Sequence, residues 1–318
     1  MPYVADPAIS RENLTMLAEQ RWEAMRLSRP DLEPAVALQR RLLALVADLG
    51  AALEQGKLPR LSLPPKYLAA KLTRGVPILA GEPIPQPAAV MKPTLLALCK
   101  ALEAGGAGEA AAHIHAALAT GQMEAGSLLT ASLSRDQRAI REGAVHRGLA
   151  PDLVWLVAEL AVSPFAYHLQ RMLLGPSPGF GHAGSGPASP ELRAALDAWT
   201  HGYCPACGSW PAVAEAVDGH RTLRCSFCAA GWELKTYACI YCGEHGEPFA
   251  TSAPDADRHD RRLELCSTCG GYLKTIDLPA LSPFPLLSIS DIETTDLDVI
   301  AMEHGFRRPQ LKDLARKG

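Results

Sequence analysis

The 318-residue sequence has no uninterrupted apolar run close to the roughly 18 residues that a membrane-spanning helix requires. Its most apolar stretch, residues 148–169, is interrupted by Asp152, Glu159 and Pro164. The first 30 residues are rich in charged side chains and have no apolar core segment, so no secretory signal is visible. We therefore expect no membrane partner and a cytoplasmic location.

The sequence also has no excess of basic residues. The 31 Lys and Arg residues are outnumbered by 34 Asp and Glu residues, and the net charge of −3 excludes a strongly basic nucleic-acid coat. Between residues 201 and 280, seven basic residues stand against ten acidic ones. Only Arg258, Arg261 and Arg262 cluster, and acidic residues interleave with them. Because binding to phosphates depends on clustered positive charge, we expect no nucleic-acid partner.

Familiar catalytic motifs are missing as well. The chain contains no P-loop, no G-x-G-x-x-G, no nucleophile elbow and no H-E-x-x-H. Its nine cysteines are too few for a disulfide scaffold in a chain of this length. We therefore expect a protein that is not an enzyme, with no catalytic residues to assign.

Residues 1–174 have the pattern of an α-helical domain. Ala and Leu are abundant, β-branched residues are sparse, and apolar residues recur near the helical period. The predicted helices cover residues 7–28, a second segment between Asp31 and Gly56, then 65–73, 93–104, 107–120, 122–133, 134–147, 151–162 and 164–174. Residues 175–190 are mostly Gly, Pro and Ser, so 175–200 is predicted to be a linker that ends in a short helix at 190–200.

Beyond Cys204 the pattern changes to short strands. Asp218-Gly219 is a strong hairpin signal between predicted strands at 211–217 and 220–224, and 232–237 and 272–278 also have strand character. The tail, 282–318, contains one predicted helix at 294–305. The predicted fold class is therefore α+β.

Eight of the nine cysteines form four C-x-x-C pairs inside a tandem repeat. The segment CSFCAAGWELKTY (225–237) aligns with CSTCGGYLKTI (266–276), and CPACG (204–208) aligns with CIYCG (239–243). The remaining Cys99 lies in an apolar run and is interpreted as a buried thiol. The repeat predicts two four-cysteine β-hairpin ribbons, one at 201–238 and the other at 239–281.

A C-x-x-C turn brings two thiolates to one metal ion, and a glycine just after the second cysteine helps because this turn often requires a positive φ. Gly208, Gly243 and Gly270 occupy that position in three pairs, whereas the fourth has Ala229. The repeat assigns two metal sites, composed of Cys204, Cys207, Cys225 and Cys228 in the first and Cys239, Cys242, Cys266 and Cys269 in the second. Four thiolates suit zinc and a single iron equally.

Three alternatives to this assignment stay open at the level of sequence. The first and third pairs can share one ion in a cross-brace, since spacing alone does not fix connectivity. The pairs can form disulfides, which a reducing compartment disfavours. The thiols can also be unligated and carry sulfur.

Two further groups of residues have structural interpretations. Trp210, Trp232, Tyr241 and Tyr272 lie beside the cysteine pairs, and we interpret them as packing residues of ribbons too small for a core of their own. Arg135, Arg138 and Arg141 recur every three residues and are predicted to form a solvated helix face.

The order of these motifs resembles the FdhE family of formate dehydrogenase accessory proteins. The resemblance is carried by CPACGSWP at 204–211, by CSFC followed by Gly231-Trp232-Glu233, by CIYCG at 239–243 and by CSTCGGYLKTID at 266–277. The N-terminal segment RPDLEPAVALQRRLL (29–43) is similar in style but less diagnostic.

The resemblance implies a cytoplasmic maturation factor that active formate dehydrogenase requires. Its implied partner is the molybdenum- or tungsten-containing catalytic subunit of that enzyme, and its eight paired cysteines are implied to form two rubredoxin-like sites, with iron favoured and zinc as the other candidate. Two alternative functions remain: a redox or sulfur-handling factor that acts on the client's molybdenum cofactor, and a zinc-ribbon protein that binds nucleic acid.

Overall fold

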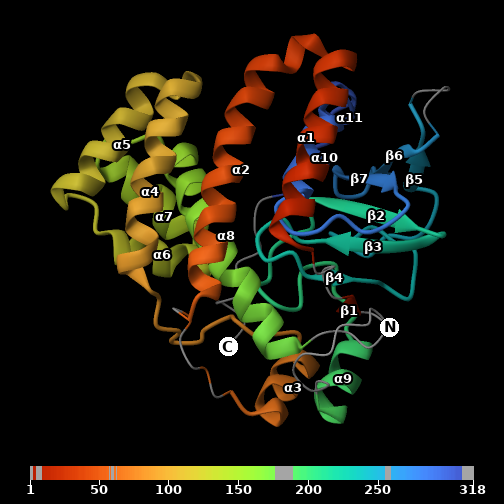
Figure 1. Ribbon diagram of the computed structural model, residues 1–318. Coiled ribbons are helices and arrows are strands. Elements are labelled where there is room, and N and C mark those ends of the chain that lie inside the picture. Colours follow the sequence, from red (N-terminus) through yellow and green to blue (C-terminus); the bar gives the residue numbers. More distant parts are fainter. Residues whose placement is uncertain are drawn as a thin grey trace.

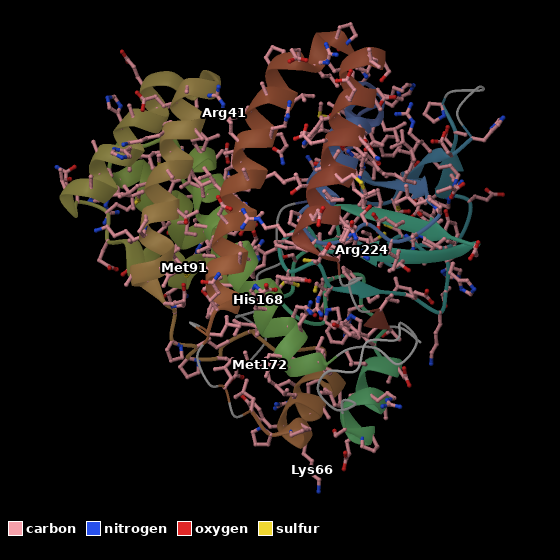
Figure 2. All side chains as sticks on the ribbon, in the orientation of Figure 1. Arg41, Lys66, Met91, His168, Met172 and Arg224 are labelled. Carbon is pink, nitrogen blue, oxygen red and sulfur yellow. The ribbon has the colours of Figure 1, made fainter. Side chains whose placement is uncertain are left out.

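The computed structural model describes residues 3–4, 9–56, 58, 61, 63–175, 189–254 and 259–309. A bundle of helices fills one side of the molecule and a twisted sheet fills the other, which confirms the predicted α+β class (Figure 1). Figure 2 places Met91 among the helices and Arg224 on the sheet, and both side chains are fully buried. Within the described residues, no helix is both long and apolar enough to cross a membrane.

Most of the helices lie where the apolar periodicity predicts them. Their bounds are α1 (Arg11–Ser28), α2 (Glu33–Glu54), α3 (Pro65–Thr73), α4 (Ala88–Leu102), α5 (Gly108–Thr120), α6 (Ala125–Leu133), α7 (Gln137–His146), α8 (Pro151–Leu174), α9 (Pro190–Asp197), α10 (Leu287–Glu293) and α11 (Thr295–Glu303). Helix α8 packs against α2, α4, α6 and α7 and is therefore the centre of the bundle.

Helix α8 differs from the prediction of two helices separated at Pro164. It continues through that proline without a break. Proline has no N–H to give to the carbonyl of Leu160, one turn earlier. The hydroxyl of Ser163 donates to this carbonyl instead, at 3.4 Å, so the helix keeps a partner for it.

The strands form one sheet of seven strands within the described residues. They are β1 (Tyr3–Val4), β2 (Val213–Val217), β3 (His220–Arg224), β4 (Gly231–Trp232), β5 (Phe249–Ser252), β6 (Arg261–Cys266) and β7 (Gly271–Asp277), in the spatial order β1-β4-β3-β2-β7-β6-β5. The strands of the first cysteine repeat and those of the second meet at β2 and β7, which pair in parallel, while every other pairing is antiparallel. The two ribbons are therefore halves of one continuous sheet.

Strands β5 and β6 were not predicted from the sequence. In β6, Arg261 occupies the register of the apolar residues Leu263 and Leu265, and Glu264 faces the opposite side of the strand, yet both charged residues are buried. Glu264 accepts hydrogen bonds from Arg221 on β3 at 2.6 Å and from Thr275 on β7 at 2.7 Å. These partners compensate the buried charge, but sequence periodicity does not reveal them.

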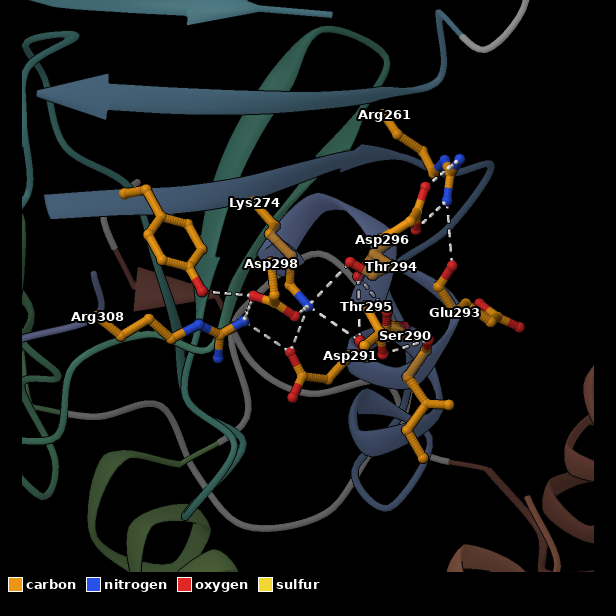
Figure 3. Close-up of polar contacts among 12 residues, drawn as sticks. Arg261, Lys274, Ser290, Asp291, Glu293, Thr294, Thr295, Asp296, Asp298 and Arg308 are labelled. Carbon is orange, nitrogen blue, oxygen red and sulfur yellow. Dashed lines mark hydrogen bonds and ion pairs between the residues drawn. The ribbon is translucent and has the colours of Figure 1, made fainter. Parts of the chain in front are cut away.

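The C-terminal helices are attached to the sheet by a network of charges. Lys274 of β7 is fully buried, and its Nζ lies 2.7 Å from a carboxylate oxygen of Asp291 and 2.7 Å from one of Asp298 (Figure 3). Arg308 reaches the same two carboxylates from the other side, at 2.9 and 2.8 Å. The predicted tail helix is present as α11, whereas α10 was not predicted.

One large apolar core extends from the helices into the sheet. It contains Met91 and Phe165 of the bundle together with Phe227, Trp232 and Leu273 of the sheet region. The predicted Gly/Pro linker falls almost wholly on residues 176–188, outside the described residues. The division into domains at 174, 200, 238 and 281 stays a prediction.

Candidate metal sites

All four C-x-x-C pairs fold into the same tight turn. In each, the backbone N–H of the residue after the second cysteine donates to the carbonyl of the first cysteine, at 2.8 to 2.9 Å. That residue has a positive φ in every case, namely 86° at Gly208, 56° at Ala229, 83° at Gly243 and 68° at Gly270. The turn places both thiols of a pair on the same side, as the sequence predicts for three pairs from their glycines.

Ala229 adopts a backbone conformation that a Cβ atom disfavours. Its methyl group is completely buried in a cluster with Val213, Ile276 and Phe284. Burial of this methyl group offsets the strain, which explains why this turn forms without glycine.

The structure gathers the eight cysteines into the two sets that the tandem repeat predicts. Within each set the four sulfur atoms lie within 4.8 Å of one another. The first set contains Cys204, Cys207, Cys225 and Cys228, and the second contains Cys239, Cys242, Cys266 and Cys269. The cross-brace, which would join the first pair with the third, is not the arrangement found.

The spacing of the sulfurs suits a tetrahedral metal ion. The sulfur of Cys207 lies 3.5 Å from that of Cys225, and the sulfur of Cys242 lies 3.6 Å from that of Cys266. Disulfide sulfurs are about 2.05 Å apart. In a tetrahedron with zinc–sulfur bonds of about 2.3 Å, the sulfurs are separated by about 3.8 Å. Each group of four thiols can therefore hold a metal ion, and all nine cysteines are free of disulfides.

The first set is enclosed on every side by protein. Its four cysteines are at most 3% exposed. The turn between Cys204 and Cys207 is attached to the segment after α3, because the carbonyls of Pro205 and Ala206 accept hydrogen bonds from the backbone N–H groups of Ile78 and Leu79 at 3.0 and 2.9 Å. A proline-rich connection therefore covers this site.

Arg135 brings a positive charge to the first set from the turn between α6 and α7. Its guanidinium lies 3.9 Å from the ring centre of Phe227, which stands between Cys225 and Cys228, and 4.8 Å from that of Trp155. It donates to Glu159 at 2.9 Å. The predicted solvated face is therefore wrong for Arg135, whose side chain is only 9% exposed, although Arg138 is largely exposed.

The thiols of the first set have perturbed acidities. Burial raises the pKa of Cys204 and Cys228 well above the ordinary range of a thiol. Burial acts in the same direction on Cys207, but hydrogen bonds from the other three thiols and the positive charge of Arg135 outweigh it and hold the pKa of Cys207 well below its usual value. A bound cation favours the thiolate form of every ligand.

The second set lies at the edge of the molecule. Cys239 and Cys266 are buried, but Cys269 is half-buried and Cys242 is exposed. Burial raises the pKa of Cys269 to about 11. The C-terminal segment supports this site, since the N–H of Arg307 donates to the carbonyl of Gly270 at 2.8 Å.

The aromatic residues near the cysteines pack as the sequence analysis predicts. Trp232 is completely buried in the main core. The ring of Trp210 contacts Tyr203 and Tyr241 edge-on, at centroid distances of 5.9 and 5.0 Å. Two residues beside the first set were not predicted from the sequence: Tyr203, which immediately precedes the first cysteine pair, and Arg135, whose charge approaches the set from the helical bundle.

Comparison with known proteins gives one consistent family of relatives. The chain is 32% identical over 113 residues to a protein FdhE homolog of Aquifex aeolicus, 36% over 116 residues to one of Pseudomonas putida, and 29% over 141 residues to one of Stutzerimonas stutzeri. The matched segments are 34%, 33% and 37% of this chain and span less than half of each relative, namely 40%, 36% and 46%. No protein-family model matches the chain.

A solved structure shares the fold over the whole length. The crystal structure of the FdhE protein from Pseudomonas aeruginosa covers 100% of both chains with a TM-score of 0.58 and 23% sequence identity. The curated relatives confirm the resemblance to the FdhE family that the cysteine motifs predict, and the solved structure shows that the fold is shared.

Proposed function

We propose that this chain is a non-enzymatic accessory protein that formate dehydrogenase requires for activity and that acts in the cytoplasm. The observation that carries the proposal is the pair of tetracysteine groups, formed by four C-x-x-C turns whose order in the sequence resembles the FdhE family. The absence of catalytic motifs from the sequence supports a role without catalysis of its own.

The proposed partner is the catalytic subunit of formate dehydrogenase. This assignment follows from the family resemblance. A tagged chain co-expressed with that subunit is expected to retain it through affinity purification, and a strain lacking the chain is expected to lose formate dehydrogenase activity. Failure to retain the subunit, together with full activity in the deletion strain, would contradict the proposal.

The proposed metal ligands are the eight cysteines of the two sets. The resemblance favours one iron ion in each set, and the same four thiolates suit zinc. A bound ion would cross-link the two C-x-x-C turns of a set and would thereby stabilise the folded ribbon. Metal analysis and the visible absorption of freshly purified protein identify the ion: thiolate-to-iron bands indicate iron, and a colourless protein with two zinc ions per chain excludes it.

A redox or sulfur-handling role is the second candidate, and the exposure of Cys242 is the observation that favours it. This role requires a site that external molecules can reach. Reversible bleaching of iron bands by a reductant would support it. Nucleic-acid binding has no such support, because acidic residues outnumber basic ones around the cysteines.

A further inference from the structure

The two cysteine sets differ in how easily a molecule from solution can reach them. All four cysteines of the first set are buried, whereas the second set exposes Cys242 and leaves Cys269 half-buried. The two repeat units that supply the cysteine sets are similar in sequence, so the difference in exposure arises from the residues that surround each set. Apart from Phe227, the covering groups of the first set come from outside its own ribbon.

Exchange of a thiolate-bound metal requires an incoming donor atom to replace one ligand. At the first set, such an approach is obstructed by Phe227, by the Arg135–Glu159 pair and by the segment at Ile78 and Leu79. Removal of this cover requires the sheet to separate from the helices, which disrupts the main core. At the second set, replacement of Cys242 requires no such opening.

A cleft leads to the exposed side of the second set. It has a volume of about 500 Å³ and is lined by Cys239 and Cys242 together with the aromatic side chains of Trp210 and Tyr241. Its polar lining includes Lys235, His201 and His245, and no acidic residue is among the described residues that line it. This volume and lining suit a small anionic molecule.

We propose that the second set, Cys239, Cys242, Cys266 and Cys269, is an exchangeable metal site that a small anionic thiol or chelator reaches through this cleft, while the first set releases its ion only when the core opens. The proposal rests on the proposed function only in that both sets bind metal. During exchange with a thiol, the sulfur of Cys242 leaves the ion and accepts the proton that the incoming thiol gives up. No electron is transferred.

The test measures metal release from the full chain loaded with two zinc ions. An excess of the anionic chelator 4-(2-pyridylazo)resorcinol is expected to remove one ion per chain in a fast phase. The other ion is expected to leave more slowly, by on the order of tenfold or more, because its release requires the core to open. Iodoacetamide added during the fast phase is expected to modify the cysteines of the second set and to leave those of the first set unmodified.

Two variants identify the fast site. Cys242→Ser is expected to keep one ion per chain and to lose the fast phase. Cys99→Ala is the matched control, because Cys99 is a buried cysteine outside both sets, and it is expected to keep two ions and both phases.

The outcomes separate this inference from the proposed function. Loading with fewer than two ions in the unmodified chain would overturn the proposed metal sites and this inference with them. Two ions released at a common rate, a fast phase that persists in Cys242→Ser, or equal alkylation of the two sets would overturn the inference alone.

Discussion

At the scale of single residues, the four cysteine turns show how burial decides the effect of one methyl group. Ala229 and Gly243 occupy equivalent positions with positive φ. A Cβ atom at Ala229 is buried in an apolar cluster, whereas a Cβ atom added at Gly243 would have no neighbour within 4 Å. The backbone strain is similar at both positions, and only Ala229 has burial to offset it.

We expect Gly243→Ala to lower the free energy of unfolding by about 1–2 kcal/mol, since nothing compensates the left-handed backbone. In Ala229→Gly, the relieved strain is opposed by the lost methyl burial of about 0.8 kcal/mol and by the greater unfolded-chain entropy of glycine, about 0.4–1 kcal/mol, so we expect a change within about 0.5 kcal/mol. Urea unfolding of the metal-loaded proteins measures both. Equal losses in the two variants would contradict this explanation.

A second residue-scale prediction concerns Arg135. Arg135→Met leaves the partly buried Glu159 without its cation, so we expect a loss of about 2–3 kcal/mol in unfolding free energy, less than the loss of about 3–5 kcal/mol for a fully buried pair. Arg138→Met is the control, because Arg138 and Glu142 form an exposed pair and the expected loss is below about 0.5 kcal/mol. Adding Glu159→Gln to Arg135→Met is expected to restore part of the stability. A double variant no more stable than Arg135→Met would contradict the explanation that the uncompensated charge of Glu159 causes the loss.

At the scale of elements, the attachment of α10 and α11 to the sheet depends on ionised carboxylates around Lys274. Burial alone would raise the pKa of Asp291, but Arg308 and Lys274 outweigh it and hold that pKa below the ordinary value of 3.8. Lys274 and Arg308 also contact Asp298, and Tyr272 donates to that carboxylate at 2.7 Å. Figure 3 shows these groups converging from β7, α10, α11 and the segment after α11.

Because the pKa of Asp291 is lower in the folded protein than in the unfolded chain, its contribution to stability is complete above the unfolded value and disappears as the pH falls through the folded one. We therefore expect the C-terminal helices to lose protection from hydrogen exchange below about pH 4. Asp291→Asn should weaken protection at neutral pH and flatten this dependence. An unchanged pH profile in that variant would exclude Asp291 as the cause.

At the scale of the whole molecule, the first cysteine set joins the helices to the sheet, while the second set stabilises the turn between β6 and β7 at one end of the sheet. Cysteines of the first set belong to the main core that also contains residues of the bundle. The second set lies beside β6 and β7, where Cys266 pairs with Gly271. Loss of an ion should therefore have different consequences at the two sites.

We expect Cys207→Ser to lower the free energy of unfolding by about 5 kcal/mol or more and to destabilise helices and sheet together, because metal binding and folding are coupled there. Cys242→Ser should lower the free energy of unfolding by less. Its helical circular dichroism signal should remain intact at temperatures where Cys207→Ser has unfolded. Thermal unfolding followed at 222 nm distinguishes the two variants. Equal midpoints would show that the sites contribute alike.

The sequence by itself determined the helical first half and the four cysteine turns. Its tandem repeat favoured the two sets of four cysteines, and the structure then selected them over the cross-brace. Each of these depends on local spacing: apolar residues one helical turn apart, a glycine after a C-x-x-C pair, and a repeat that preserves the order of the pairs. Local chemistry is enough to specify such features.

Only the tertiary structure decided that the two ribbons form one sheet, that α8 continues through Pro164, and that Arg135 is buried beside Phe227. Strand β6 escaped prediction because its buried charges are compensated by residues distant in the chain, Arg221 among them. The unequal exposure of two similar cysteine sets has the same origin. The burial of a segment depends on the residues that pack against it. Many of those residues are distant in the sequence, so their contacts produce no periodic pattern that a sequence-based prediction can use.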